Sequence, residues 1–258
     1  MARPQPDREA DVPVQRLRIR YAKRGRLRFT SHRDFQRALE RALRRAAVPM
    51  AFSGGFSPHP RVSYAGAAPT GSASEAEYVE IALAERVDPD RVRADLDASL
   101  SDGLDVLAVV EAVPGTPALP ELLTGSVWEI VLPGLTEGDA AAAVRAFLAA
   151  DRVEVERMTK KGMRRFDARA AVVRCEVSRA SARALAESRG ECAILRLVVR
   201  HGTPAVRPDD VLAGLRVVAD LRPPSPPAVT RLRQGPLDEG TGEVLDPFAS
   251  ETRAARTT

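Results

Sequence analysis

Short stretches of this chain alternate between apolar and polar residues, a pattern typical of half-buried β-strands. The first such stretch sets Leu17, Ile19 and Tyr21 between arginines. From residue 35 to residue 46 the apolar side chains instead recur every three or four positions, which predicts an amphipathic helix with arginines on its other faces. The chain therefore opens with a strand followed by a helix.

The same patterns, followed along the chain, predict the order β-α-β-β-α-β and then an approximate second copy of it. In the first copy we expect later strands at 61–68, 78–83 and 104–113, and a helix from Asp88 to Gly103. In the second copy we expect strands at 127–132, 153–158, 166–177 and 192–200, and helices at 136–150 and 208–215. This order predicts an α+β fold of tandem ferredoxin-like halves with antiparallel sheets.

Composition along the chain suggests where these halves begin and end. Residues 1–14 and 234–258 lack periodicity, so we expect a disordered tail at each end. The first domain is expected at 15–113 and the second at 126–233. Prolines and a glycine gather between them, which is typical of a linker and places it at 114–125.

Charge is distributed unevenly along the chain. The 258 residues carry a net charge of only +4, yet the segment from Arg16 to Arg45 holds twelve basic residues against two acidic ones. A local positive field of this strength attracts polyanions, nucleic acid first. The alternative is an arginine-rich composition whose side chains are simply solvated, because arginine and alanine are frequent throughout the chain.

Several classes of protein are disfavoured by the sequence. No apolar run is long enough to span a bilayer, and the first residues lack the apolar core of a secretory signal, so we expect a cytoplasmic protein without membrane contact. Cys175 and Cys192 are the only cysteines and lack the spacing of a zinc or iron–sulfur site. We expect no cofactor and no bound metal.

Two motifs flank the predicted arginine-rich helix. Ser31 and Asp34 resemble a capping box, which places His32 and Arg33 in the first turn, where backbone N–H groups favour an anion. After the helix, Gly54-Gly55 is followed by two prolines that bracket His59, and Arg61 comes next. Such a loop suits a binding site, although an ordinary connecting loop with a solvated histidine is an equal alternative.

Three segments of the chain are similar to a known family. They read F-T-S-H-R-D (29–34), S-G-G-F-S-P-H-P-R-V-S (53–63) and T-K-K-G followed by F-D-A-R (159–169). They resemble the radical-SAM-associated domain of unknown function, DUF2344, in the free-standing version typical of actinobacteria. The resemblance covers residues 16–233. It implies a radical SAM protein as partner, while this chain lacks the cysteine triplet that would bind the cluster of that enzyme.

The resemblance and the charge pattern together favour an accessory protein that presents RNA, or an RNA-linked substrate, to a separate radical SAM enzyme. Whether the chain catalyses a reaction stays open. The alternative function is a metal-independent RNA-processing enzyme in which His32 and His59 act as acid and base, with Arg33 or Arg61 stabilising charge. A metal site made from these histidines and Asp34 is a third possibility, although the cap is expected to occupy Asp34.

The candidate contacts to RNA or substrate come from the helix, the loop and a basic hairpin tip further on. Asp167 and Arg169 are expected on one face of a strand there, beside that tip. The full set is Ser31, His32, Arg33, Arg37, Arg41, Arg44, Gly55, Phe56, His59, Arg61, Lys160, Lys161, Arg164, Asp167 and Arg169.

Overall fold

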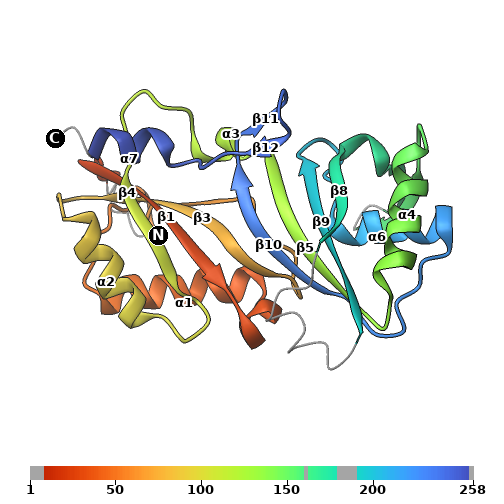
Figure 1. Ribbon diagram of the computed structural model, residues 1–258. Coiled ribbons are helices and arrows are strands. Elements are labelled where there is room, and N and C mark those ends of the chain that lie inside the picture. Colours follow the sequence, from red (N-terminus) through yellow and green to blue (C-terminus); the bar gives the residue numbers. More distant parts are fainter. Residues whose placement is uncertain (1–8, 160–161, 179–190, 256–258) are drawn as a thin grey trace, which may run out of the picture. The chain divides into compact units, whose positions relative to one another are not determined.

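The computed structural model describes residues 9–159, 162–178 and 191–255, and it has a mixed α/β architecture with antiparallel strand pairing (Figure 1). The chain divides into two units. Unit 1 comprises Met1–Leu122 and Pro247–Thr258, and unit 2 comprises Leu123–Asp246. In the described part of the chain, no helix has the length and apolar character needed to cross a membrane.

Unit 1 contains a four-stranded antiparallel sheet. Its strands are β1 (Gln15–Lys23), β2 (Val62–Ala65), β3 (Ala73–Leu83) and β4 (Val106–Glu111), and its helices are α1 (His32–Arg45), α2 (Pro89–Ser99), α3 (Leu119–Leu122) and α7 (Ala249–Ala255). A 3₁₀ turn, η1 (Gly25–Phe29), precedes α1. β4 pairs with β1, β1 with β3, and β3 with β2. The sequence predicted this set of strands and both long helices.

The core of unit 1 follows from the alternation in β1. Leu17, Ile19 and Tyr21 are buried against apolar residues of α1 and α2, and the Tyr21 ring stacks on Phe35 of α1 with 4.3 Å between ring centroids. Because neighbouring strand residues point to opposite faces, the arginines of β1 lie on the other face of the sheet. α1 buries its own apolar stripe and leaves its arginines exposed.

Unit 2 also has antiparallel strands, in which β10 pairs with β5, β5 with β9, and β9 with β8. Two hairpins, β6–β7 between α4 and β8 and β11–β12 after β10, form separate two-stranded sheets. The elements are β5 (Gly125–Pro133), α4 (Glu137–Ala149), β6 (Glu154–Thr159), β7 (Gly162–Asp167), η2 (Arg169–Ala171), β8 (Val172–Ser178), β9 (Cys192–Arg200), α6 (Pro208–Ala219), β10 (Ala228–Gly235), β11 (Leu237–Asp238) and β12 (Glu243–Val244).

One glycine sets how closely α4 and α6 approach each other. A Cβ atom at Gly214 of α6 would lie 2.6 Å from Cε2 of Phe147 in α4 and 3.2 Å from Cγ1 of Val153. Glycine at this position lets the Phe147 ring pack directly on the α6 backbone, and that ring is fully buried.

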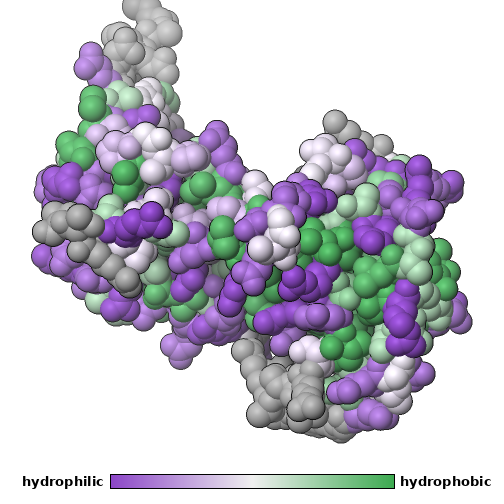
Figure 2. Space-filling view, turned by 45° about the horizontal axis from the view of Figure 1, so that its top comes forward, coloured by the Kyte–Doolittle hydropathy of each residue, from purple (hydrophilic) through white to green (hydrophobic). Residues whose placement is uncertain are grey.

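Hydrophobic residues also gather on part of the unit 2 surface among hydrophilic ones (Figure 2).

The structure corrects the expected disordered tail at 234–258. The described residues of this segment form the end of β10, the β11–β12 hairpin and α7. The hairpin turn is closed locally, because Asp238 accepts hydrogen bonds from the N–H groups of Gly240 and Thr241. α7 is held through contacts distant in sequence, chiefly from Glu251, and these leave no periodic signal in the segment itself. The strand expected at 166–177 is also interrupted, by η2.

His201, which follows β9, is a partly buried side chain with two hydrogen-bond partners, and it leads to a prediction about pH. Its Nδ1 lies 2.6 Å from the carbonyl oxygen of Leu123 and its Nε2 lies 3.0 Å from Oγ of Ser126. Burial lowers the pKa of His201 below its ordinary value. The unfolded chain therefore takes up a proton near pH 6.5 that the folded protein resists, so His201 should reduce stability as the pH falls below about 6.5.

Urea denaturation of the wild type and of His201→Gln between pH 5 and pH 8 checks this prediction. The variant should show a smaller loss of unfolding free energy on acidification than the wild type does. An equal pH dependence in both proteins would mean that His201 does not contribute to it.

Candidate functional site

The start of α1 is capped as the sequence predicted. The N–H of Asp34 donates to Oγ of Ser31 over 3.2 Å, and the Ser31 hydroxyl donates to Oδ2 of Asp34 over 2.7 Å. The carboxylate therefore completes the cap through the serine side chain. This fixes the first turn, in which His32 and Arg33 are exposed.

Four arginines of α1 form one exposed stripe along the helix, which we call the arginine stripe: Arg33, Arg37, Arg41 and Arg44. At 100° per residue they fall within about 80° of arc, and they extend over roughly 16 Å of helix. None of the four guanidinium groups forms an ion pair with the described residues of the chain. The stripe therefore presents uncompensated positive charge to solvent.

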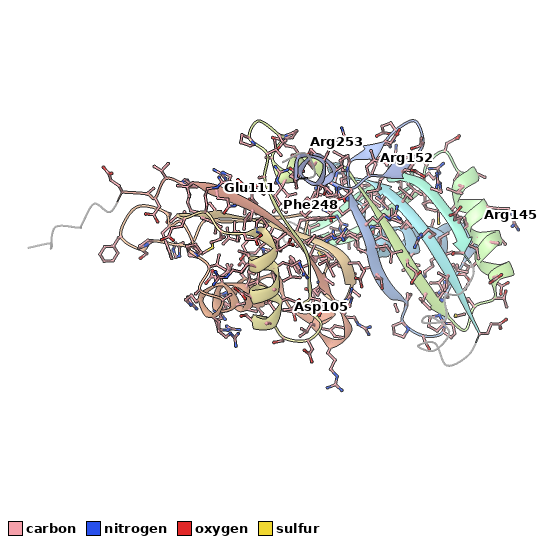
Figure 3. All side chains as sticks on the ribbon, turned by 60° about the vertical axis from the view of Figure 1, so that its left-hand side comes forward. Asp105, Glu111, Arg145, Arg152, Phe248 and Arg253 are labelled. Atoms are coloured by element: carbon pink, nitrogen blue, oxygen red, sulfur yellow. The ribbon has the colours of Figure 1, made fainter. Side chains whose placement is uncertain are left out.

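The arginines of β1 and its flank behave differently. Arg16 lies 3.2 Å from Oε1 of Glu80 and Arg18 lies 3.1 Å from Oε2 of the same carboxylate. Arg24 pairs with both Glu75 and Asp105, and the latter is labelled in Figure 3. The hydrogen bonds that Arg24 donates to Glu75 raise the pKa of Arg24 above its ordinary value. The basic cluster seen in the sequence thus includes three arginines that are paired with carboxylates, Arg16, Arg18 and Arg24, and the arginine stripe of the helix, which has no such partners among the described residues.

The loop between α1 and β2 is closed on itself at its base. The N–H of Ser53 donates to the carbonyl of His59 over 2.9 Å, and the N–H of His59 donates to Oγ of Ser53 over 3.0 Å. Gly55 has a φ of +95°, a conformation that other residues rarely adopt. The neighbouring Phe56 is 71% exposed, so the loop presents an aromatic side chain outward.

A pocket of about 290 Å³ lies where this loop meets the sheet. His59 and Arg61 line it, and Nη1 of Arg61 donates to the carbonyl of Asp11 over 2.9 Å. The remaining polar lining, which was not predicted from the sequence, comes from Ser53, Arg16, Ser63 and Glu80. Arg16 could have been predicted to lie on this face, because it is one of the polar residues that alternate with the buried residues of β1. Glu80 is already held by two arginines, while Arg61 forms no ion pair with any residue that the structure describes.

The two histidines of the motifs are not brought together. His32 lies against Tyr64, with 5.1 Å between ring centroids, and its Nε2 is 3.1 Å from Nε2 of Gln36. Tyr64 packs with the α1 side of the sheet, and burial raises the pKa of its hydroxyl. His59, by contrast, lines the pocket that contains Arg16 and Glu80, which lie on the opposite face. This arrangement gives no support to His32 and His59 as an acid/base pair.

The proposed metal site also lacks geometric support. Within the part of the chain that the structure describes, no three side chains of histidine, cysteine, aspartate or glutamate gather in a way that could hold a metal ion. Asp34 is engaged in the helix cap, as the sequence predicted.

The basic hairpin is present, but its candidate residues have different roles. Lys160 and Lys161 lie outside the described residues. Arg164 is exposed on β7. Asp167 and Arg169 do not share a strand face as expected, because Oδ1 of Asp167 accepts hydrogen bonds from the N–H groups of Val153 and Arg169 and so turns the chain into η2. The Arg169 side chain donates to the backbone carbonyl of Val172, which is a structural role.

A comparison with protein families gives one match. The family model described as "Uncharacterized protein conserved in bacteria (DUF2344)" matches residues 16–208, a range that includes the arginine stripe, the 53–61 loop and the β6–β7 hairpin. No curated protein matches the chain.

Proposed function

The chain belongs to the DUF2344 family of uncharacterised proteins conserved in bacteria, and from this premise we propose that it is an accessory protein that binds RNA, or an RNA-linked substrate, for a separate radical SAM enzyme. The observation that carries the proposal is the arginine stripe of α1. Unpaired guanidinium groups at about one helical turn apart suit a row of phosphates, which arginine binds through two parallel N–H donors.

The surroundings of the stripe favour a single-stranded segment bound mainly through its backbone. Two aromatic residues in the segments before and after α1, Phe29 and Phe56, are 60% and 71% exposed and would be available to stack on bases. Arg28 lies over the Phe29 ring at 4.8 Å. Two rings offer only a small surface for stacking. Phosphate contacts would therefore supply most of the affinity and make it sensitive to salt.

The pocket beside the 53–61 loop would hold one further anionic group. Arg61 supplies charge there, while His59 and the serines supply hydrogen bonds. The pocket and the stripe lie on opposite faces of the unit 1 sheet, so a strand that used both would have to pass around the edge strand β2. This role is a binding role and requires no proton transfer between the two histidines.

We further infer that each unit is a ferredoxin-like half. The strand orders β4-β1-β3-β2 and β10-β5-β9-β8 both place the first strand of a unit beside its third and fourth, as a β-α-β-β-α-β chain with antiparallel pairing requires. The β6–β7 hairpin is then an insertion in the second half. Sheets of this kind are a common support for RNA recognition.

The partner assignment is tested by affinity purification from a bacterium that encodes the protein. We expect a radical SAM protein to be enriched with the tagged chain, together with RNA, when compared with the tag alone. Ribonuclease treatment before elution distinguishes a direct protein contact, which survives it, from a contact through RNA, which does not. Enrichment of RNA without any radical SAM protein would refute the partner and leave the RNA-binding role standing.

A further inference from the structure

A second pocket, of about 250 Å³, lies on the sheet of unit 2. Its floor crosses the sheet in one row, because Arg233 of β10 pairs with Val127 of β5, Val127 with Val198 of β9, and Val198 with Arg174 of β8. Both valines are buried, at 9% and 4% exposure. An apolar floor therefore has a guanidinium group at each end.

The β11–β12 turn forms one wall of this pocket and fixes one of its arginines. Nη2 of Arg174 donates to the carbonyl of Thr241 over 3.0 Å. Gly242 has a φ of +69°, and a Cβ atom there would lie 3.0 Å from Cγ1 of Val173 and 3.6 Å from Nη2 of Arg174. Glycine lets the turn approach the arginine closely. Val244 of β12 then packs with the two floor valines.

The charges around the pocket are only partly compensated. Arg233 has no hydrogen bond or ion pair with any described residue, and Arg174 uses one of its five N–H donors on Thr241. Arg196, also in the lining, lies 4.0 Å from Glu129. Two carboxylates, those of Glu176 and Glu243, complete the lining. Three cations against two lining carboxylates favour an anion of low charge.

We infer that this pocket binds a compact organic anion, a small planar or apolar body that carries a single phosphate or carboxylate group. The body would lie against the apolar lining that Val127, Val198 and Val244 form, and the anionic group would meet Arg233, which has no partner among the described residues. The two carboxylates would repel a continuous chain of phosphates, so the pocket does not suit an RNA strand. The inference is thus separate from the proposed function of unit 1.

Phenyl phosphate and benzoate are suitable probes, since they combine a planar body with a phosphate and a carboxylate respectively. Inorganic phosphate supplies only the anionic group, and benzyl alcohol supplies only the planar body. In NMR titrations of the full chain, at least one of the combined probes should shift the methyl signals of Val127, Val198 and Val244, with an affinity at least about tenfold above that of either half-probe.

The variant Arg233→Gln should weaken binding of that probe about tenfold, because a charge-assisted hydrogen bond is replaced by a neutral one. The matched control is Arg145→Gln in α4, whose exposed side chain does not line the pocket (Figure 3). It should bind as the wild type does. Both variants change exposed side chains, and unchanged methyl spectra without probe establish that they fold.

Three results would overturn the inference. The first is the absence of valine shifts with both combined probes, and the second is equal binding by wild type and Arg233→Gln. The third is equal affinity for inorganic phosphate alone, which would indicate a nonspecific contact of anions with arginine. A response to benzoate but not to phenyl phosphate, or the reverse, identifies the anionic group that the pocket takes.

Discussion

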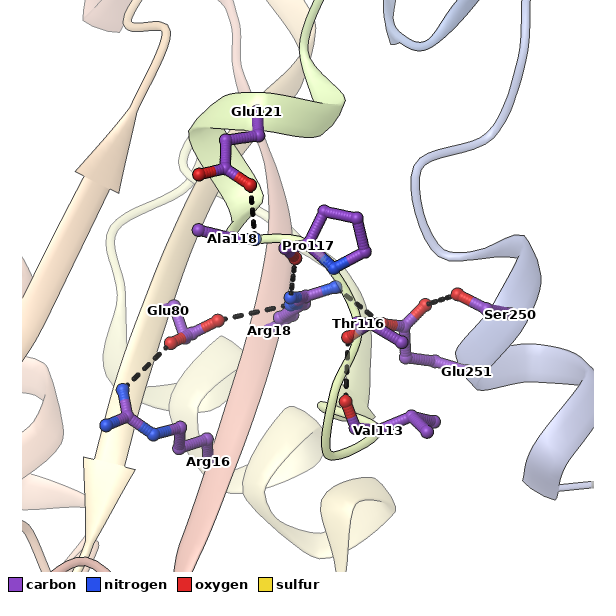
Figure 4. Close-up of polar contacts among 10 residues, drawn as sticks. All are labelled: Arg16, Arg18, Glu80, Val113, Thr116, Pro117, Ala118, Glu121, Ser250 and Glu251. Carbon is purple, nitrogen blue, oxygen red and sulfur yellow. Dashed lines mark hydrogen bonds and ion pairs between the residues drawn. The ribbon is translucent and has the colours of Figure 1, made fainter.

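Replacing Arg18 with alanine should lower the free energy of unfolding by about 3–5 kcal/mol, the usual cost of leaving one partner of a buried ion pair alone. The guanidinium of Arg18 is 3% exposed and Glu251 is fully buried. Nη1 of Arg18 lies 2.5 Å from Oε1 of Glu251, Nη2 donates to the carbonyl of Pro117, and Nε donates to Glu80. Figure 4 draws these three contacts. The substitution removes all three contacts at once.

Arg16 provides a control on the same strand. It lies 3.2 Å from the other oxygen of Glu80, but its side chain is 55% exposed. Arg16→Ala should therefore cost only about 0–1 kcal/mol. Urea denaturation of the two variants and the wild type measures both values. Equal losses of unfolding free energy in the two variants would show that burial does not increase the contribution of the Arg18–Glu251 ion pair to stability.

A double variant separates the ion pair from general packing. Replacing Arg18 by methionine and Glu251 by leucine removes both charges and keeps much of their volume, so it should be less destabilising than either single change. Limited proteolysis adds a local measurement, because the single variant Glu251→Ala should expose the α7 segment to cleavage before the rest of unit 1 unfolds.

The parts of this fold that the sequence predicted are those with local causes. The alternation around Leu17 and the three- and four-residue spacing after Phe35 each identify an element because its buried face repeats with the period of the backbone. The Ser31–Asp34 cap is contained within four residues and was predicted for the same reason. The motifs of the DUF2344 family are equally local, and the family match confirms that resemblance.

The features that could not be predicted from the sequence depend on contacts between residues far apart in the chain. Glu251 meets Arg18 across 233 positions, and no pattern within 234–258 indicates such a contact. The same limit applies to the two histidines, since the sequence places them in neighbouring motifs but the folded sheet determines their surroundings, Tyr64 for His32 and the pocket with Glu80 for His59. Counting arginines likewise overstated the free charge, because the acids that neutralise Arg24 lie more than fifty residues away.

The second large expected effect is a loss of RNA affinity when the arginine stripe is changed. In the double variant Arg37→Glu with Arg41→Glu, single-stranded RNA should bind roughly 100-fold more weakly at low salt, because two charge-assisted contacts are lost and replaced by repulsion. Both side chains are exposed, so the fold should be retained. Each phosphate contact on a single strand contributes about 0.7 to the slope of log affinity against log salt, so the slope should become shallower by about 1.4.

The matched control is Arg91→Glu with Arg93→Glu in α2, which makes the same change of charge on another exposed helix of unit 1. There Arg91 lies 3.5 Å from Asp95 and Arg93 lies 4.0 Å from Asp90, so both arginines already have acidic neighbours. Titrations of labelled RNA at about 50 and about 200 mM salt compare the two variants. Equal losses would indicate that total charge, and not the stripe, determines binding. Unchanged affinity and slope in the α1 variant would leave a protein partner, and not RNA, as the ligand of this face.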